Sequence, residues 1–471
     1  MPSLSSMPSG FFSLWRQHRR GYAQILKMSL PLIVGMGSST VMQLTDRIFL
    51  ANYSLTAMAA AMPAGIAAFV PTAFFMGVGT YVNVFIAHYC GAKSKQRIGP
   101  ALWAGIYFSL ISGGVLALLS LTSPLLFSAG GHPLPVREME NIYCGTLLLG
   151  GGFNVLMAVL GCFYSGQGIT RPIMLINLAG MCLNVPLTYL LINGAGPFPE
   201  LGILGSALAT VIAWIFECLV FAALIFTPAN MPVFNLRPAW PKPGLLRRLS
   251  RFGLPNGVHF MADMAAFAVF VFLVGRMGLN SLAATNIVFS INQIAFMPLL
   301  GLGMAVSILV GQSLGASRIA AARLAADQAL HLAMVYMLII ALWFMLAPLP
   351  LLELFRPRDM SPEEFLVISG TGADMLRLVA LYCIFDAFTI VYAGALKATG
   401  DTRFIMLIML LCALLVMIMP TVLAVRFDWG IMFSWYAMTA YVCLLGLIYW
   451  LRFRSKAWEG IEVVGKEEGN I

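Results

Sequence analysis

Apolar stretches long enough to cross a lipid bilayer recur along the whole chain, separated by short clusters that contain Pro, Gly, Arg or Lys. A membrane-spanning helix needs about 20 mainly apolar residues, because each residue adds only about 1.5 Å of rise. The stretches predict twelve helices, over residues 23–50, 55–89, 99–127, 140–165, 170–193, 202–227, 249–277, 282–314, 321–354, 369–398, 402–426 and 429–453.

The chain also contains an internal repeat. Leu30-Pro31, Gly77-x-Gly79 and Gly91-Ala92 return 224 residues later as Leu254-Pro255, Gly301-x-Gly303 and Gly315-Ala316. Gly168-x-Thr170-Arg171 returns as Gly400-x-Thr402-Arg403, a shift of 232 (400 − 168) that implies a short insertion in the second copy. The repeat predicts two pseudo-symmetric six-helix bundles. A duplicated membrane bundle is typical of a transporter whose halves move around a site at their interface.

A proline-dense basic segment separates the two copies and cannot continue a helix, because proline lacks the backbone N–H. We therefore expect a cytoplasmic tail over residues 1–22, an N-lobe over 23–227, a cytoplasmic linker over 228–248, a C-lobe over 249–453 and a cytoplasmic tail over 454–471. Each lobe has an even number of helices, so both lobes should have the same orientation in the membrane.

Composition agrees with an all-α integral membrane protein. The 471 residues are 60% hydrophobic and 10% charged, with a mean hydropathy of +0.89, which leaves too little polar surface for a soluble globule. The net charge of +9 does not indicate a nucleic-acid partner, because the basic residues concentrate in alternate loops as the positive-inside rule requires. We expect a multi-pass protein of the cytoplasmic (inner) membrane with both termini cytoplasmic. The eight cysteines show no Cys-x-x-Cys spacing, so neither disulfides nor a metal is expected.

Four acidic residues fall deep inside predicted helices and are candidate functional groups, since an ionised carboxylate in hydrocarbon is expensive. They are Asp46, Glu217, Asp263 and Asp386. For each, the alternative is a buried acid kept neutral or paired for packing. Asp46 could also form an ordinary interfacial pair with its neighbour Arg47. The role of Glu217 stays open, because Thr210 is its only polar neighbour at helical spacing.

Polar residues accompany two of these acids at helical spacing. Asn256, His259 and Asp263 fall on one face of the seventh helix, and Tyr382 lies one turn before Asp386. His259 is either a satisfied core histidine or a proton-sensitive partner of Asp263. The repeat places Asn154 at the position of Asp386 (386 − 232), so one copy carries an amide where the other carries an acid.

The motifs together resemble those of multidrug and toxic compound extrusion (MATE) transporters, of the NorM-like rather than the DinF-like branch. Besides the repeated motifs, the resemblance rests on Asn184-x-Pro186-Leu187 and Gly202-Ile203-x-x-Ser206. It implies a non-enzymatic, cofactor-free antiporter in which Na⁺ or H⁺ runs down its gradient while a drug-like organic cation is exported through a cavity between the lobes. We expect the chain to be a monomer.

The resemblance also implies site residues. It assigns cation coupling to Asp46, Asp263, Tyr382 and Asp386, and we place Asn154, Asn184, Asn256 and His259 in the substrate cavity. Two positions depart from the family: Thr188 stands where the DinF-like branch has a second N-lobe acid, and His88 stands where a glutamine is common, although Gln312 keeps it in the second copy.

Three alternatives fit less well. A flippase or exporter of a lipid-linked metabolite in the same superfamily would favour a basic cavity for phosphates, whereas the deep charges here are acidic. A major-facilitator transporter would carry a Gly-Asp-Arg type of signature after its second helix, which the sequence lacks. A non-transporting scaffold gives no reason for buried acids.

Overall fold

The computed structural model describes residues 9–128, 132–194, 196–240, 242–356 and 361–464. Within these ranges the regular secondary structure is helical, and twelve helical segments are long and apolar enough to cross a membrane. The predicted all-α class and the predicted number of spans are therefore confirmed. Residues 1–8 and 465–471 of the two predicted tails lie outside the described ranges.

The first half of the chain forms the N-lobe. Its helices are α1 (Ser9–Tyr53), α2 (Leu55–Gly79), α3 (Val82–Gly91), α4 (Ile98–Ser120), α5 (Ser123–Ser128), α6 (Leu134–Gly166), α7 (Arg171–Asn193) and α8 (Ile203–Ile225). The second half forms the C-lobe, after the short α9 (Asn230–Phe234) and α10 (Pro243–Arg248). Its helices are α11 (Leu254–Gly275), α12 (Leu279–Gly315), α13 (Ile319–Leu346), α14 (Pro348–Glu353), α15 (Pro362–Ala398), α16 (Thr402–Cys412), α17 (Met419–Phe427) and α18 (Ile431–Arg454).

Prolines account for two of the differences from the predicted helix bounds. The spans predicted to end at residues 127 and 354 each divide into a long helix and a short one, α5 or α14, that begins at or next to a proline. The linker, predicted only to interrupt the helices on either side of it, contains the short helices α9 and α10. Pro243 occupies the first position of α10. The N–H group at that position has no acceptor within the helix, so a proline there costs no hydrogen bond.

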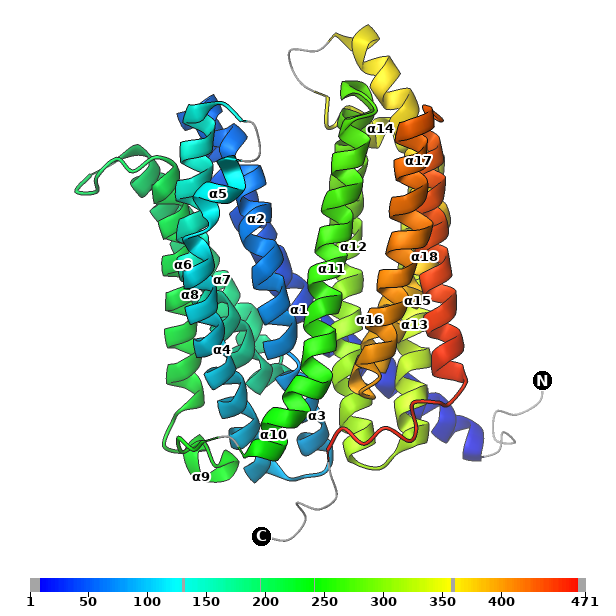
Figure 1. Cartoon of the computed structure of the whole chain (residues 1–471). Helices are drawn as coiled ribbons and strands as arrows, with labels where there is room; N and C mark the ends of the chain where they lie inside the picture. Colours follow the sequence, from blue (N-terminus) through cyan, green and yellow to red (C-terminus); the bar gives the residue numbers. More distant parts are fainter. Residues whose placement is uncertain (1–8, 129–131, 195, 241, 357–360, 465–471) are drawn as a thin grey trace, which may run out of the picture.

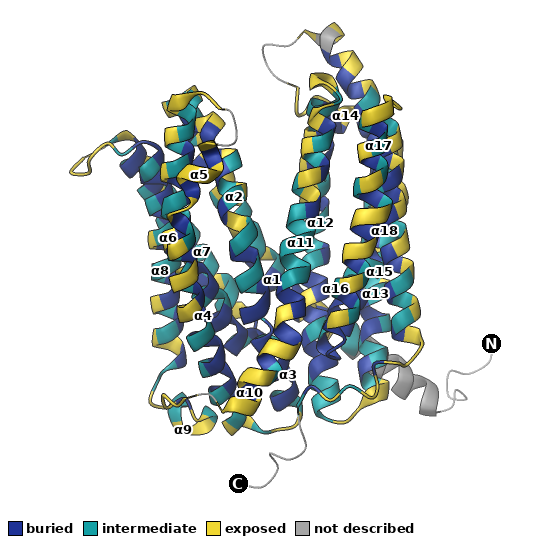
Figure 2. Cartoon of the chain, viewed as in Figure 1, coloured by how far each residue is buried: buried dark blue, intermediate teal, exposed yellow. Residues whose placement is uncertain are grey.

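The two lobes stand side by side, meet at the end that carries α3 and α10, and diverge toward the end that carries α5 and α14 (Figure 1). Between the lobes α1 packs on α12, α2 packs on α11 and α3 packs on α12. Buried residues gather where the lobes meet (Figure 2). The packed end also carries the linker, so the lobes are held together on the side of the chain where the two halves are joined.

The repeated Gly-Ala motif explains how closely the lobes approach. A Cβ atom on Gly91 would overlap the carbonyl oxygen of Gln312, and a Cβ atom on Gly315 would overlap the carbonyl oxygen of His88. These two contacts are related by the internal repeat, since Gly91 and Gly315 are 224 residues apart. Any side chain at either position would force the ends of α3 and α12 apart.

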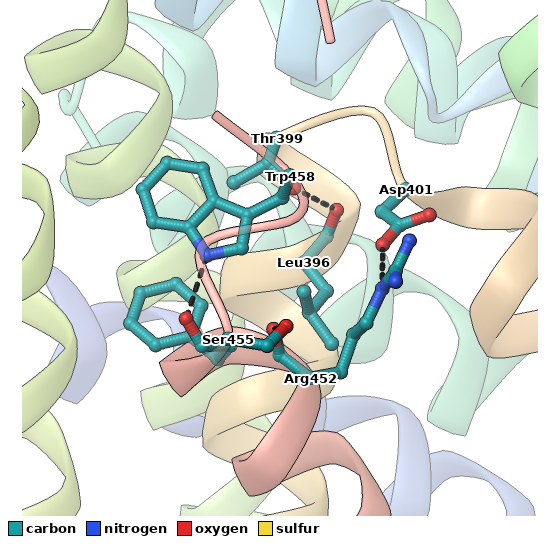
Figure 3. A network of polar contacts seen from close by, with 7 residues as sticks. Leu396, Thr399, Asp401, Arg452, Ser455 and Trp458 are labelled. Carbon is teal, nitrogen blue, oxygen red and sulfur yellow. Dashed lines mark hydrogen bonds and ion pairs between the residues drawn. The ribbon is translucent and has the colours of Figure 1, made fainter. Parts of the chain in front are cut away.

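Residues 455–464, named here the strap, cross the packed end after α18 (Figure 1). Trp458 is 1% exposed, stacks on Phe453 with ring centroids 5.1 Å apart and donates to the Phe453 carbonyl oxygen at 2.7 Å. Beside it, Arg452 donates to Asp401 at 2.7 Å (Figure 3). Further along, Val463 belongs to the same apolar cluster as N-lobe residues such as Tyr81. The strap therefore joins the apolar clusters of both lobes.

Candidate functional site: buried acids in both lobes

Asp386 lies buried in α15, one helical turn after the buried Tyr382, and the two side chains interact electrostatically. Asn292 of α12 donates its Nδ2 hydrogen to the Tyr382 hydroxyl at 3.4 Å. The Asn292 Oδ1 atom is buried and has no partner among the described residues. A carboxyl group, a phenol and a free amide oxygen therefore gather in the C-lobe, and such oxygen groups bind protons or hard cations.

Asp263 joins this group from α11. Its carboxyl group interacts electrostatically with that of Asp386, and Lys397, in the last turn of α15, interacts with both Asp263 and His259. The His259 Nδ1 atom is buried without a partner in the described part of the chain. Asp386 is buried and Asp263 is half-buried, and two carboxyl groups that repel each other favour the uptake of a positive charge beside them.

The C-lobe thus brings together the predicted residues Tyr382, Asp386, Asp263 and His259. Sequence reasoning missed Asn292 and the interior position of Lys397. Lys397 follows Asp386 by eleven residues, which is close to three helical turns. That spacing places both side chains on one face of α15 and is the signal that could have found it.

Asp46 is the centre of a second polar group, in the N-lobe. It is 6% exposed, and its carboxyl oxygens accept hydrogen bonds from Thr188 at 2.9 Å and from Thr210 at 3.3 Å. Asn184, one turn before Thr188 on α7, is 0% exposed, and neither polar atom of its side chain has a partner among the described residues. The interfacial pair of Asp46 with Arg47 was a wrong alternative, because the acid is buried against α7 and α8 while Arg47 is exposed.

The MatE family profile matches residues 31–190 and residues 255–423, which are the two copies of the internal repeat. This chain belongs to the MATE family. The "Probable multidrug resistance protein NorM" of Burkholderia pseudomallei is 29% identical over 435 residues, covering 91% of this chain and 88% of that protein. The "Multidrug resistance protein NorM" of Burkholderia vietnamiensis is 30% identical over 383 residues, covering 81% and 82%. The chain is thus NorM-like, as the sequence motifs predicted.

Solved structures of MATE proteins share the fold. A transporter from Pyrococcus furiosus superimposes with a TM-score of 0.82 at 21% identity, covering 93% of this chain and 97% of that one. The eukaryotic MATE transporter AtDTX14 gives a TM-score of 0.82 at 18% identity, covering 94% and 97%. At such identities the likeness concerns the fold of two six-helix lobes alone.

Two residues of this MATE protein that were predicted to line the substrate cavity lie outside the clusters around Asp46 and Asp386. Asn256 is buried in α11 and donates to the Gly77 carbonyl oxygen of α2 at 2.6 Å, so it joins the lobes where they pack. Asn154 is buried in α6 of the N-lobe, at the position that Asp386 holds in α15, and no described contact connects it to Asp46. Neither residue is brought into the clusters around Asp46 and Asp386.

The unusual His88 belongs to a pair of hydrogen bonds between the lobes. Its Nε2 atom lies 2.8 Å from the carbonyl oxygen of Ala398, the last residue of α15. In the other direction Gln312 donates to the carbonyl oxygen of Gly166, the last residue of α6, at 3.0 Å. Each bond satisfies a carbonyl group at a helix end, where intrahelical partners are missing. The repeat relates the two bonds, because 312 − 88 is 224 and 398 − 166 is 232.

Proposed function

We propose that this MATE protein is an antiporter that exports drug-like organic cations across the cytoplasmic membrane, driven by Na⁺ or H⁺ moving inward. The observation that carries the proposal is the pair of carboxyl groups of the half-buried Asp263 on α11 and the buried Asp386 on α15, with amide and imidazole atoms beside them that have no partner among the described residues. The names of the relatives support the cargo, since both NorM proteins are described as multidrug resistance proteins.

Competition for these carboxyl groups couples the two movements. An organic cation and the coupling ion both carry positive charge, so each weakens the binding of the other at Asp263 and Asp386. By linkage the effect is reciprocal: a coupling ion that lowers substrate affinity is displaced by substrate to the same extent. Asp46 supplies a further acid in the N-lobe, held by Thr188 and Thr210.

The arrangement of the lobes supports alternating access. They pack at the end with the linker and diverge at the other, and the basic loops favour a cytoplasmic location for the linker end. In this proposed orientation the described state is closed toward the cytoplasm. Rocking one lobe against the other about the contacts of α1 with α12 and of α2 with α11 would open that end. We propose that a single chain carries out the cycle.

Reconstituted vesicles test the proposal. We expect efflux of a fluorescent organic cation to be driven by an inward Na⁺ gradient or by an inward H⁺ gradient, but not by both equally. Asp386→Asn should abolish the driven component, whereas the exposed Asp374→Asn on the same helix should keep it. If neither gradient moves any of several organic cations, the export of drugs is excluded and a lipid-linked cargo becomes the better explanation.

A further inference from the structure

Glu217 is a buried carboxyl group that the proposed transport mechanism does not use. It lies in α8 with 6% exposure, and none of the described residues is placed within hydrogen-bonding distance of it. Burying a carboxyl group without partners is unfavourable, yet packing does not require an acid here. The Glu217 Oε1 atom fills the space beside Gly180 on α7, where a Cβ atom would overlap it.

Helical register connects Glu217 to the Asp46 cluster. On α7, Gly180, Asn184 and Thr188 follow one another at intervals of four residues and so share one face. Thr188 donates to Asp46 at one end of this face, and Gly180 contacts Glu217 at the other. On α8, Thr210 and Glu217 are seven residues apart, about 10 Å of rise, also on one face. Asn184 therefore lies between the two acids, with both polar atoms buried and unpartnered.

The C-lobe shows that the fold does not need polar residues at these places. Gly202-Ile203 begins α8 as Gly430-Ile431 begins α18, a shift of 228 (430 − 202). This shift places Leu445 at the position of Glu217 and Met438 at that of Thr210. The other shifts of the repeat place Val416 at the position of Asn184 and Phe270 at that of Asp46. The same scaffold packs entirely with apolar side chains in the second lobe, so the polar track in the N-lobe has a use other than packing.

We propose that Glu217 is a second acid for the coupling cation, H⁺ or Na⁺, so that Asp46, Asn184 and Glu217 form a two-acid track inside the N-lobe. The side-chain oxygen of Asn184 can accept a hydrogen bond from a protonated carboxyl group or bind Na⁺. Its NH₂ group can donate a hydrogen bond to whichever of the two carboxylates has no bound cation. The inference rests on the proposed antiport function.

Few other titratable groups face this track among the described residues. Tyr143 of α6 interacts with Asp46 and with Arg47 of α1, and Cys218 is adjacent to Glu217 on α8. Arg47 is exposed, so Glu217 and Asp46 are the two acids that share the interior between α1, α7 and α8. Because the interaction between buried charges is strong in a poorly solvated interior, a cation bound at one acid changes the occupancy of the other.

Glu217→Gln tests the track, since it keeps the size of the side chain and removes its charge. Purified full-length protein would be titrated with ²²Na⁺, and proton uptake would be followed with a pH-indicator dye. We expect Glu217→Gln to lower the affinity for whichever ion binds to wild type by about tenfold or more, and Gly180→Ala to have a smaller effect in the same direction. The exposed Glu138→Gln should match wild type.

Two results separate this inference from the proposed function. In the first, wild type and Glu138→Gln show gradient-driven efflux, and Glu217→Gln has the same ion affinity and the same efflux rate. That result overturns the track and leaves antiport standing. If wild type itself shows no gradient-driven efflux, antiport fails first. The track is supported if Glu217→Gln loses ion affinity but keeps the wild-type melting temperature and the wild-type binding of organic cations. Loss of a purely structural acid would not lower ion affinity alone.

Discussion

Removing the paired hydrogen bonds of His88 and Gln312 should open the packed end of the lobes. Each bond caps a carbonyl group at a helix end across the interface, at 2.8 Å and 3.0 Å. A buried carbonyl group left without its donor costs about 1–3 kcal/mol. The double variant His88→Ala, Gln312→Leu leaves two such groups and should therefore destabilise the packed arrangement by about 2–6 kcal/mol. Because 1.4 kcal/mol corresponds to a factor of ten, the ratio of open to packed molecules should rise about 30-fold or more.

Distances between spin labels on the two lobes measure this ratio. Labels at Lys95→Cys and Arg318→Cys report on the packed end, since both positions are exposed there, one on each lobe. The more accessible native cysteines, Cys90, Cys182 and Cys443, would be changed to serine. In wild type we expect one short distance. In the double variant we expect a second, longer distance to become prominent.

The repeat supplies a matched control. His88→Gln introduces the side chain that the second copy carries at the equivalent position, so it should restore the bond to the Ala398 carbonyl oxygen and keep the short distance. The reasoning is refuted if the double variant has the wild-type distance distribution, or if His88→Gln opens the packed end as far as His88→Ala does.

Three further predictions concern the strap and the C-lobe site. Trp458→Ala should lower the free energy of unfolding by about 3–5 kcal/mol, because a buried ring that stacks on Phe453 is lost; thermal unfolding in detergent measures this, and the exposed Trp240→Ala is the control. Asp386→Asn should leave expression and melting temperature unchanged while removing gradient-driven efflux; driven efflux at the wild-type rate would contradict its role. Asn292→Leu should weaken the apparent affinity for the coupling ion about tenfold, measured from the ion dependence of efflux; an unchanged ion dependence would exclude Asn292 from the site.

Much of the fold could be predicted from the sequence because hydrocarbon imposes a strict length on apolar segments. Twelve stretches of suitable length gave twelve helices, and the repeated motifs identified the two lobes. The short helices α9 and α10 were missed because they lie in the proline-dense basic linker, outside the apolar stretches. The bounds of α5 and α14 were missed because a proline within an apolar stretch marks both the end of one helix and an acceptable start of the next. Hydropathy alone does not separate these two cases.

The candidate site was predicted unevenly. Acids inside apolar helices are visible in sequence because their burial is costly, and Asp263 and Asp386 do come together. Asn292 and Lys397 were missed because contacts between α11, α12 and α15 depend on how the helices pack. Asn256 shares a helical face with Asp263, yet its side chain donates to the Gly77 carbonyl group where α2 packs on α11, a contact that the sequence did not predict. The register within one helix predicts which residues share a face. It does not predict which other helix packs against that face.

Antiport itself is tested most directly by driving the cycle backwards. Vesicles containing the protein would be prepared without any ion gradient, and an outward gradient of an organic cation would be imposed. Antiport predicts that the organic cation leaving the vesicles draws Na⁺ or H⁺ inward, as followed by ²²Na⁺ uptake or by an internal pH dye, and that Asp386→Asn abolishes this ion movement. An organic-cation flux at the wild-type rate with no opposing movement of either ion would contradict the account.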